Sequence, residues 1–140
     1  YVSCNIKREV VENDPKEKGE RALLNFGHTL GHAIEKEMNF SLYHGECVVL
    51  GMIAALNICV ELGTITANER DDALKTFALY EFPDHVTGIK IDDVVAVSKN
   101  DKKMDSGIIK FILLHSIGDA YVDRTVTEDE MKQALNQVLV

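Results

Sequence analysis

An apolar segment of the chain reads His44-Gly-Glu-Cys-Val-Val-Leu-Gly-Met-Ile-Ala-Ala-Leu-Asn-Ile-Cys-Val-Glu-Leu-Gly63. Its apolar residues recur at helical spacing, and Gly63 stands where a helix commonly ends in a left-handed glycine. The helix would be apolar on nearly every side, so the rest of the chain must cover it. We therefore predict a long helix that begins near His44 and forms the buried centre of the domain.

Other helices and one β-hairpin are expected around this segment. Capping patterns at Asp14-Pro15-Lys16-Glu17, Thr66-Ala-Asn-Glu69 and Thr127-Glu-Asp-Glu130 predict helices that run to about Glu37, Tyr80 and Leu139. Apolar spacing predicts two more helices, over residues 2–12 and 91–99. Residues 108–114 and 120–122 are β-rich and flank Ser116-Ile-Gly118-Asp119, which predicts a hairpin. The fold class that we expect is mainly α: a multi-helix domain with one small β-hairpin, in which residues 1–140 form a single domain.

Composition limits the partners of the chain. The net charge of −8 and the pI near 5.0 argue against nucleic acid and against anionic membranes. No apolar run approaches the roughly 20 residues that a bilayer span requires, so no membrane partner is expected. Three widely spaced cysteines, two of them in the apolar helix, indicate reduced thiols and a cytoplasmic protein. Tyr1 begins the sequence in place of Met, which suggests a truncated chain, such as the C-terminal domain of a longer protein.

Three of the five histidines lie between residues 28 and 44. The two motifs are Asn25-Phe-Gly-His-Thr-Leu-Gly-His32 and Tyr43-His-Gly-Glu46. Imidazole binds transition metals and moves protons near neutral pH. On one uninterrupted helix, Arg21, Asn25, His28 and His32 would share an arc of roughly 60°. A guanidinium, an amide and two imidazoles on one stripe suit anion binding, metal ligation and proton transfer better than a solvated surface.

Each of these residues also has a structural interpretation. Histidine pairs four residues apart are common without a metal, and His44 could simply begin a helix. Glu17 could act only as a helix cap, and Lys102 and Lys103 could lie in a solvated turn. A catalytic zinc usually takes three protein ligands, so two histidines alone make an incomplete site. A non-catalytic helical interaction domain therefore remains an alternative. An interaction surface, however, has no need of Arg21 and Asn25 on the same helix face as two histidines.

The order of the motifs resembles the C-terminal domain of the 3-dehydroquinate synthase family. The matching residues are Lys7, Glu17, Arg21-Ala-Leu-Leu-Asn-Phe-Gly-His-Thr-Leu-Gly-His32, His44-Gly-Glu-Cys-Val48 and Asp101-Lys-Lys103. The resemblance implies that His28 and His44 are metal ligands and that His32 and Glu17 transfer protons. It also implies substrate binding by Lys7, Arg21, Asn25 and one of Lys102 and Lys103. Another sugar-phosphate cyclase of the same superfamily is the alternative enzyme.

The resemblance implies a lyase of the shikimate pathway. Such an enzyme converts 3-deoxy-D-arabino-heptulosonate 7-phosphate, a sugar-phosphate keto acid, to 3-dehydroquinate with the help of NAD and of zinc or cobalt. The full-length protein would be a homodimer. The G-x-G-x-x-G pattern of a nucleotide-binding domain is absent from the sequence, and the family's third metal ligand, a glutamate, has no match. We therefore expect an N-terminal nucleotide-binding domain outside this chain to bind NAD, and the chain alone to be inactive.

Overall fold

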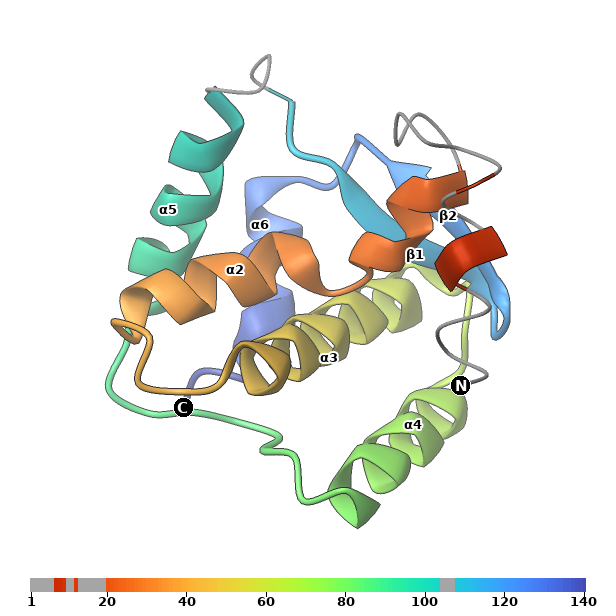
Figure 1. The fold of residues 1–140 in the computed structure, drawn as a ribbon, viewed down its shortest axis with the longest axis horizontal. Helices are drawn as coiled ribbons and strands as arrows, with labels where there is room; N and C mark the ends of the chain where they lie inside the picture. Colours follow the sequence, from red (N-terminus) through yellow and green to blue (C-terminus); the bar gives the residue numbers. More distant parts are fainter. Residues whose placement is uncertain (1–6, 10–11, 13–19, 104–107) are drawn as a thin grey trace.

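The computed structural model describes residues 7–9, 12, 20–103 and 108–140. Figure 1 shows helices arranged around one long helix, with a two-stranded hairpin at one side. This confirms the predicted fold class, mainly α with one small hairpin. The elements are η1 (Glu20–Asn25), α2 (His28–Glu37), α3 (His44–Leu62), α4 (Ala67–Leu79), α5 (Ile91–Lys103), β1 (Phe111–Ser116), β2 (Asp119–Asp123) and α6 (Glu128–Leu135).

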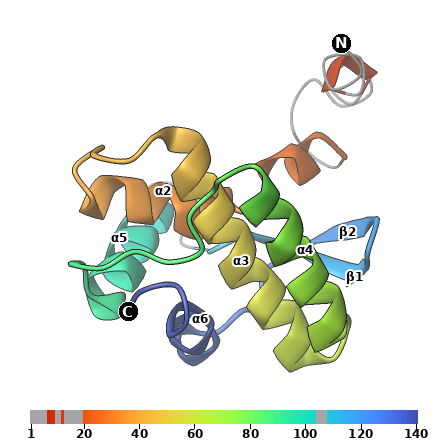
Figure 2. The same ribbon diagram turned by 90° about the horizontal axis from the view of Figure 1, so that it is seen from below.

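Helix α3 is the centre of the domain, as its apolar sequence predicts. It contacts α2, α4, α6 and β1, and Figures 1 and 2 show these elements on different sides of it. Its one buried amide is satisfied, because Asn57 Nδ2 donates to the Ala134 carbonyl oxygen at 3.1 Å and Asn57 Oδ1 accepts from Arg70 at 3.3 Å. Burial of apolar area on this helix, at about 25 cal/mol per Å², is a main source of stability.

The length of α3 corrects one expectation from the sequence. Within the described part of the chain, α3 is the one helix long and apolar enough to cross a membrane, with a mean hydropathy of 1.8. Most of that window, 67%, is nevertheless buried inside the domain. Neighbouring helices and a strand therefore cover it, as they cover the core helix of a soluble protein.

Local sequence signals fix several helix ends. The side chains of Thr66 and Thr127 accept hydrogen bonds from the backbone N–H groups of Glu69 and Glu130, which confirms both predicted N-caps. Gly63 ends α3 at φ 78°, the left-handed conformation in which glycine carries no Cβ penalty. Helix α5 runs beyond the predicted residue 99, and α6 stops before the predicted 139. Of the helix predicted over 2–12, residues 7–9 and 12 are described, and they are helical.

The predicted hairpin is present. Strands β1 and β2 pair antiparallel, with a register shift between Leu114 and Ser116, and Gly118 makes the turn at φ 89°. The first three residues of β1 are buried, and the strand packs against α3. The Oγ1 atom of Thr29 donates to the Lys110 carbonyl oxygen at 2.6 Å. This bond ties the first turn of α2 to the residue before β1.

The uninterrupted helix predicted from Asp14 to Glu37 is wrong over its described part. Residues 20–25 form the 3-10 helix η1, and Gly27 adopts φ 79° before α2 begins at His28. The cause lies outside the segment, on α3. A Cβ atom on Gly51 would overlap the Gly27 carbonyl oxygen, and one on Gly31 would lie 2.7 Å from the Cys47 carbonyl oxygen. The chain therefore turns at Gly27 where two backbones touch.

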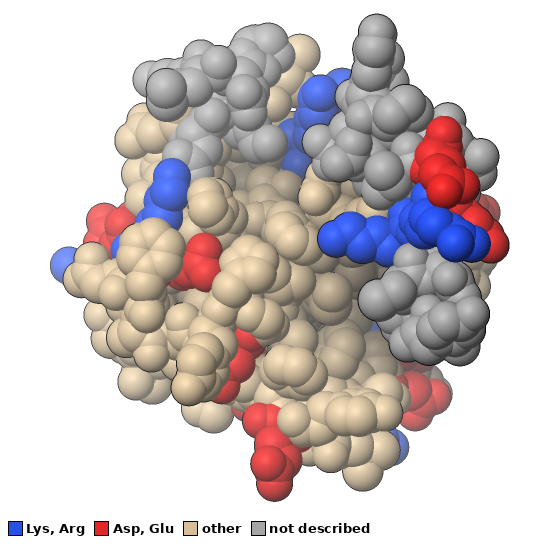
Figure 3. Space-filling view, in the orientation of Figure 1, with Lys and Arg blue, Asp and Glu red and all other residues tan. Residues whose placement is uncertain are grey.

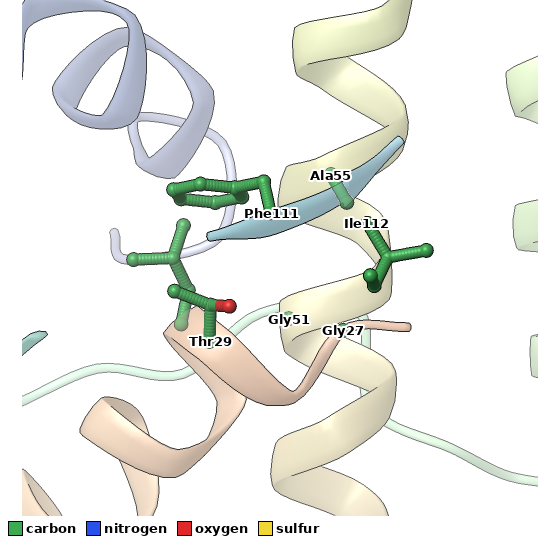
Figure 4. A pocket seen from close by; sticks show the side chains of 7 residues that line it. Gly27, Thr29, Gly51, Ala55, Phe111 and Ile112 are labelled. Carbon is green, nitrogen blue, oxygen red and sulfur yellow. The ribbon is translucent and has the colours of Figure 1, made fainter. Parts of the chain in front are cut away.

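Three glycines make the crossing of α2 and α3. Because Gly27 lies against Gly51 and Gly31 lies against Cys47, the two helices run antiparallel. Figure 4 shows Gly27 and Gly51 side by side, with β1 passing next to them. The space between these elements does not admit a water molecule. This close contact fixes how the first residues of the two helices lie relative to each other.

Candidate metal centre

His28 and His44 are the first residues of α2 and α3. Their ring centroids lie 5.6 Å apart, with the ring planes inclined at 59°. The glycine turn at Gly27 places His28 at a helix start, and Tyr43 does the same for His44 as the residue before α3. Two helices that cross at glycines thus bring together the two histidines that the family resemblance implies as metal ligands.

Both rings have their Nδ1 atom engaged. Nδ1 of His28 lies 3.2 Å from the Phe26 carbonyl oxygen, and Nδ1 of His44 lies 3.0 Å from Oε2 of Glu35. Carbonyl and carboxylate oxygens only accept hydrogen bonds, so each Nδ1 carries the hydrogen in these contacts. The lone pair of each neutral ring is then on Nε2. In this form a histidine can coordinate a metal through Nε2.

The partner of His44, Glu35, is a buried carboxylate. The residue is 7% exposed and lies in the last turn of α2. Metal-ligating histidines commonly donate their second N–H to a carboxylate, which fixes the tautomer and orients the ring. His44 and Glu35 have this arrangement in the structure.

The second oxygen of Glu35 faces His32. Oε1 lies 3.5 Å from Nδ1 of His32, three residues earlier on the same helix. The His32 side chain is 49% exposed, whereas that of Glu35 is 10% exposed. One buried carboxylate therefore contacts a predicted metal ligand with one oxygen and the predicted proton-transfer residue with the other.

Sequence reasoning missed Glu35. In Ala33-Ile-Glu-Lys-Glu37 it stands among charged residues near a helix end, which is typical of a solvated face. The signal that points to it is its spacing of three residues from His32, since side chains at i and i+3 are neighbours on a helix. The contact with His44 depends on how α2 crosses α3, so it cannot be predicted from the local sequence.

The donor set in the described residues is incomplete. Among those residues, no three His, Cys, Asp or Glu side chains form a group that could hold a metal ion. Two imidazoles with their Nε2 lone pairs available suit zinc or cobalt, for which nitrogen ligands are common. The residues present thus fit part of a catalytic site, and a further donor must complete it.

The predicted substrate-binding residues lie on several elements. Arg21 and Asn25 belong to η1, and the Gly27 turn separates them from His28 and His32. The single helical stripe expected from the sequence therefore does not form. Lys102 and Lys103 are in the last turn of α5, which packs against α2.

Two predicted site residues remain apart from the histidines or outside the described residues. Glu17 lies outside the described residues. Lys7 is exposed in a short helical segment, and Figures 1 and 2 both place that segment at the margin of the domain, away from α2. No structural feature tests the roles of these residues, which stay predictions.

The helix that begins at His44 also carries two buried thiols. Cys47 is on the first turns of α3 and is a free cysteine, as is Cys59. Burial raises the pKa of Cys47 to about 11, with further contributions from the negative charges of Glu35 and Glu46. Burial also raises the pKa of Cys59. Both thiols are therefore protonated at neutral pH, so they are poor metal ligands there.

The face of the domain that carries α2 has an uneven distribution of charge. Figure 3 shows mostly uncharged side chains over the centre of this face, with Lys or Arg side chains and Asp or Glu side chains both present around them.

Comparison with known proteins gives the family. Residues 1–104 match the family model described as 3-dehydroquinate synthase C-terminal. A 3-dehydroquinate synthase of Clostridium perfringens is 44% identical over 135 residues, and one of Clostridium botulinum is 43% identical over 129 residues. Each alignment covers 91% of this chain and 37% of the relative. The chain therefore spans a little over a third of the length of these relatives.

Solved structures share the fold. A 2-epi-5-epi-valiolone synthase from Streptomyces hygroscopicus, with NAD+ and Zn2+ bound, superposes with a TM-score of 0.78 at 24% identity, over 91% of this chain and 35% of that one. A 2-deoxy-scyllo-inosose synthase in complex with carbaglucose-6-phosphate, NAD+ and Co2+ gives 0.77 at 23% identity, over 95% and 38%. The family match covers η1, both histidine-bearing helices and all of α5, so the chain belongs to the family of 3-dehydroquinate synthase C-terminal domains.

Proposed function

We propose that this chain is the metal- and substrate-binding domain of a 3-dehydroquinate synthase. The reaction is the conversion of 3-deoxy-D-arabino-heptulosonate 7-phosphate to 3-dehydroquinate with loss of phosphate, a step of the shikimate pathway. The observation that carries the proposal is that the ring centroids of His28 and His44 lie 5.6 Å apart. In each ring, Nδ1 contacts an oxygen atom of the protein. The reaction itself is supported by the names of relatives that are 43–44% identical.

The metal would be held by His28 and His44 through Nε2. A bound zinc or cobalt ion supplies Lewis acidity at an alcohol or ketone oxygen of the substrate. The third donor would be a glutamate of another part of the protein, and the same part would bind most of the NAD. The structural neighbours that were solved with NAD+ and Zn2+ or Co2+ support this choice of cofactors.

Proton transfer belongs to His32 in this proposal. Its ring is half exposed and stands one helical turn from His28, so substrate and solvent can both reach it. A histidine titrates close to neutral pH and can therefore accept and return protons during phosphate elimination. Glu17 would be a second proton acceptor.

Substrate binding would fall to the basic and amide residues that the family resemblance implies. Arg21 can grip a carboxylate or phosphate with two parallel hydrogen bonds, and Asn25 can bind hydroxyl groups. Lys7 and one of Lys102 and Lys103 would contribute positive charge. We further propose that the full-length protein is a cytoplasmic homodimer with no nucleic-acid partner.

Phosphate release by the intact protein tests this proposal. With NAD and zinc present, we expect 3-deoxy-D-arabino-heptulosonate 7-phosphate to yield phosphate and 3-dehydroquinate. His32→Asn should lower kcat by about 10²- to 10⁴-fold, the usual contribution of general acid–base catalysis. His115→Asn, on the outer hairpin, is the matched control and should leave kcat unchanged. Release from a sedoheptulose or glucose phosphate instead would assign the protein to another sugar-phosphate cyclase.

A further inference from the structure

Glu35 differs from every other carboxylate that the structure describes, because it alone is buried. A buried charge costs free energy unless a partner compensates for it. Its partners here are two imidazole rings, with Nδ1 of His44 at 3.0 Å from Oε2 and Nδ1 of His32 at 3.5 Å from Oε1. Neither helix propensity nor solubility therefore explains why a glutamate is buried at residue 35.

The two contacts have different origins. His32 is on the same helix as Glu35, three residues earlier, so α2 alone places their side chains on one face. His44 reaches Glu35 only because the glycines hold α2 and α3 in backbone contact. Both rings present Nδ1 to the carboxylate, which leaves Nε2 as the available atom on each of them.

We propose that Glu35 is a positioning residue that couples the metal ligand His44 to the proton-transfer residue His32. Its Oε2 atom holds hydrogen on Nδ1 of His44, so that Nε2 of His44 can coordinate a divalent cation, and its Oε1 atom faces Nδ1 of His32, so that Nε2 of His32 can accept a proton from substrate. The inference rests on the proposed function for the role of His32. For His44 it needs only that the chain binds a metal.

Charge explains why one carboxylate serves both rings. Oε1 of Glu35 faces Nδ1 of His32, so a proton from substrate would enter at Nε2 while the ring keeps its orientation. A metal on Nε2 of His44 makes its Nδ1–H a stronger donor to the other oxygen of Glu35. The carboxylate therefore supports both events, whereas a neutral amide cannot. A glutamine has one oxygen and one NH₂ group, so it accepts from one ring and presents hydrogens to the other.

A purely structural role is the competing explanation, since Glu35 also links α2 to α3. Such a role predicts loss of stability when the residue is changed, with no change in metal affinity or in the histidine tautomers of the folded protein. The two explanations therefore differ in what is measured on protein that remains folded.

The test compares Glu35→Gln with Glu37→Gln in the intact protein. Glu37→Gln removes the same charge from the same helix and is the matched control. Zinc affinity is measured by competition with a chelator. We expect it to fall about 10- to 100-fold for Glu35→Gln, as for other changes to the partners of metal ligands, and to stay within about twofold for the control. An unchanged affinity in folded Glu35→Gln protein would overturn the proposal.

Histidine tautomers supply a second readout that needs no metal. Long-range ¹H–¹⁵N correlation spectra of the unmodified protein should show His44 with hydrogen on Nδ1. In Glu35→Gln the His44 signals should move toward the Nε2–H form. Hydrogen on Nε2 of His44 in the unmodified protein would overturn the proposal even if the Glu35→Gln variant does not fold.

Turnover separates this inference from the proposed function. At saturating zinc, Glu35→Gln should lower kcat in the unmodified background and have little further effect in the His32→Asn background, because the two residues act as a unit. Equal losses in both backgrounds would contradict coupling through His32. If the unmodified protein binds zinc but does not turn over the seven-carbon substrate, the proposed function fails, and zinc affinity and tautomers still decide the role of Glu35 toward His44.

Discussion

At the scale of single residues, the partner of Nδ1 decides whether Nε2 of a histidine has a lone pair available for a ligand. Phe26 occupies Nδ1 of His28 through its carbonyl oxygen, and Glu35 occupies Nδ1 of His44. Both partners are fixed by the backbone or by burial, so the rings are oriented before any ligand arrives. Preorganisation of this kind lowers the entropic cost of binding a metal.

Cys47 gives a prediction about pH. The folded state keeps its thiol protonated to about pH 11, whereas an ordinary thiol ionises near 9.0. Between these values the folded chain binds more protons than the unfolded chain, so stability falls as the pH rises. The contribution of the Cys47 thiol to the free energy of unfolding is fully present below pH 9.0. We expect about 1 to 3 kcal/mol of it to be lost between pH 9 and 11.

Urea denaturation at several pH values measures this effect. The variant Cys47→Ala has no thiol to ionise, so its stability should fall less steeply over the same range. Equal slopes for the two proteins would show that the buried thiol does not cause the loss. In the folded protein at neutral pH, Cys47 should also react with thiol reagents only as fast as the chain opens.

The histidines could be predicted as site residues, and their carboxylate partner could not. His28, His32 and His44 stand out because imidazoles are rare and their spacing is short. Glu35 is one of many acidic residues in a chain of net charge −8. Its importance comes from burial against α3, which is a property of the tertiary structure.

At the scale of the elements, the crossing of α2 and α3 is what places the histidines. Gly51→Ala would put a Cβ atom onto the Gly27 carbonyl oxygen. That oxygen belongs to the backbone and cannot rotate away, so the two helices must separate. We expect the free energy of unfolding to fall by about 3 kcal/mol or more, at the upper end of overpacking changes.

Thermal or urea unfolding of Gly51→Ala measures this loss, with Gly45→Ala as the control on the same helix. A Cβ atom on Gly45 would meet nothing within 4 Å, and alanine is the better helix former. We expect Gly45→Ala to keep or slightly raise the stability. If both variants had the same stability, close packing at Gly51 would not be what holds the helices together.

The turn at Gly27 shows the limit of prediction from local sequence. The caps at Thr66 and Thr127 and the hairpin were predicted because their causes lie within a few residues of each element. Glycine inside a helical pattern costs only about 1 kcal/mol, so residues 14–37 were predicted as one helix. The break depends on Gly51, which is 24 residues away in sequence and is brought there by the fold.

At the scale of the whole molecule, the described residues bring the two predicted metal ligands, His28 and His44, together and include no group of three side chains that could hold a metal. The Glu35 carboxylate contacts His44 with one oxygen and the half-exposed His32 with the other. Such a site would be completed by a donor from elsewhere in the protein. We expect metal to stabilise the intact protein, because a ligand that binds only the folded state adds to its stability.

Zinc titration of the intact protein by calorimetry tests the central claim, that His28 and His44 bind the metal. Loss of one ligand should weaken binding by about 100-fold, a typical share of the affinity of a protein zinc site. We expect this loss for His28→Ala and for His44→Ala. His85→Ala, whose ring pairs with Asp84 on the surface, should bind as tightly as the unmodified protein. Tight zinc binding that neither His28→Ala nor His44→Ala weakens would contradict the account.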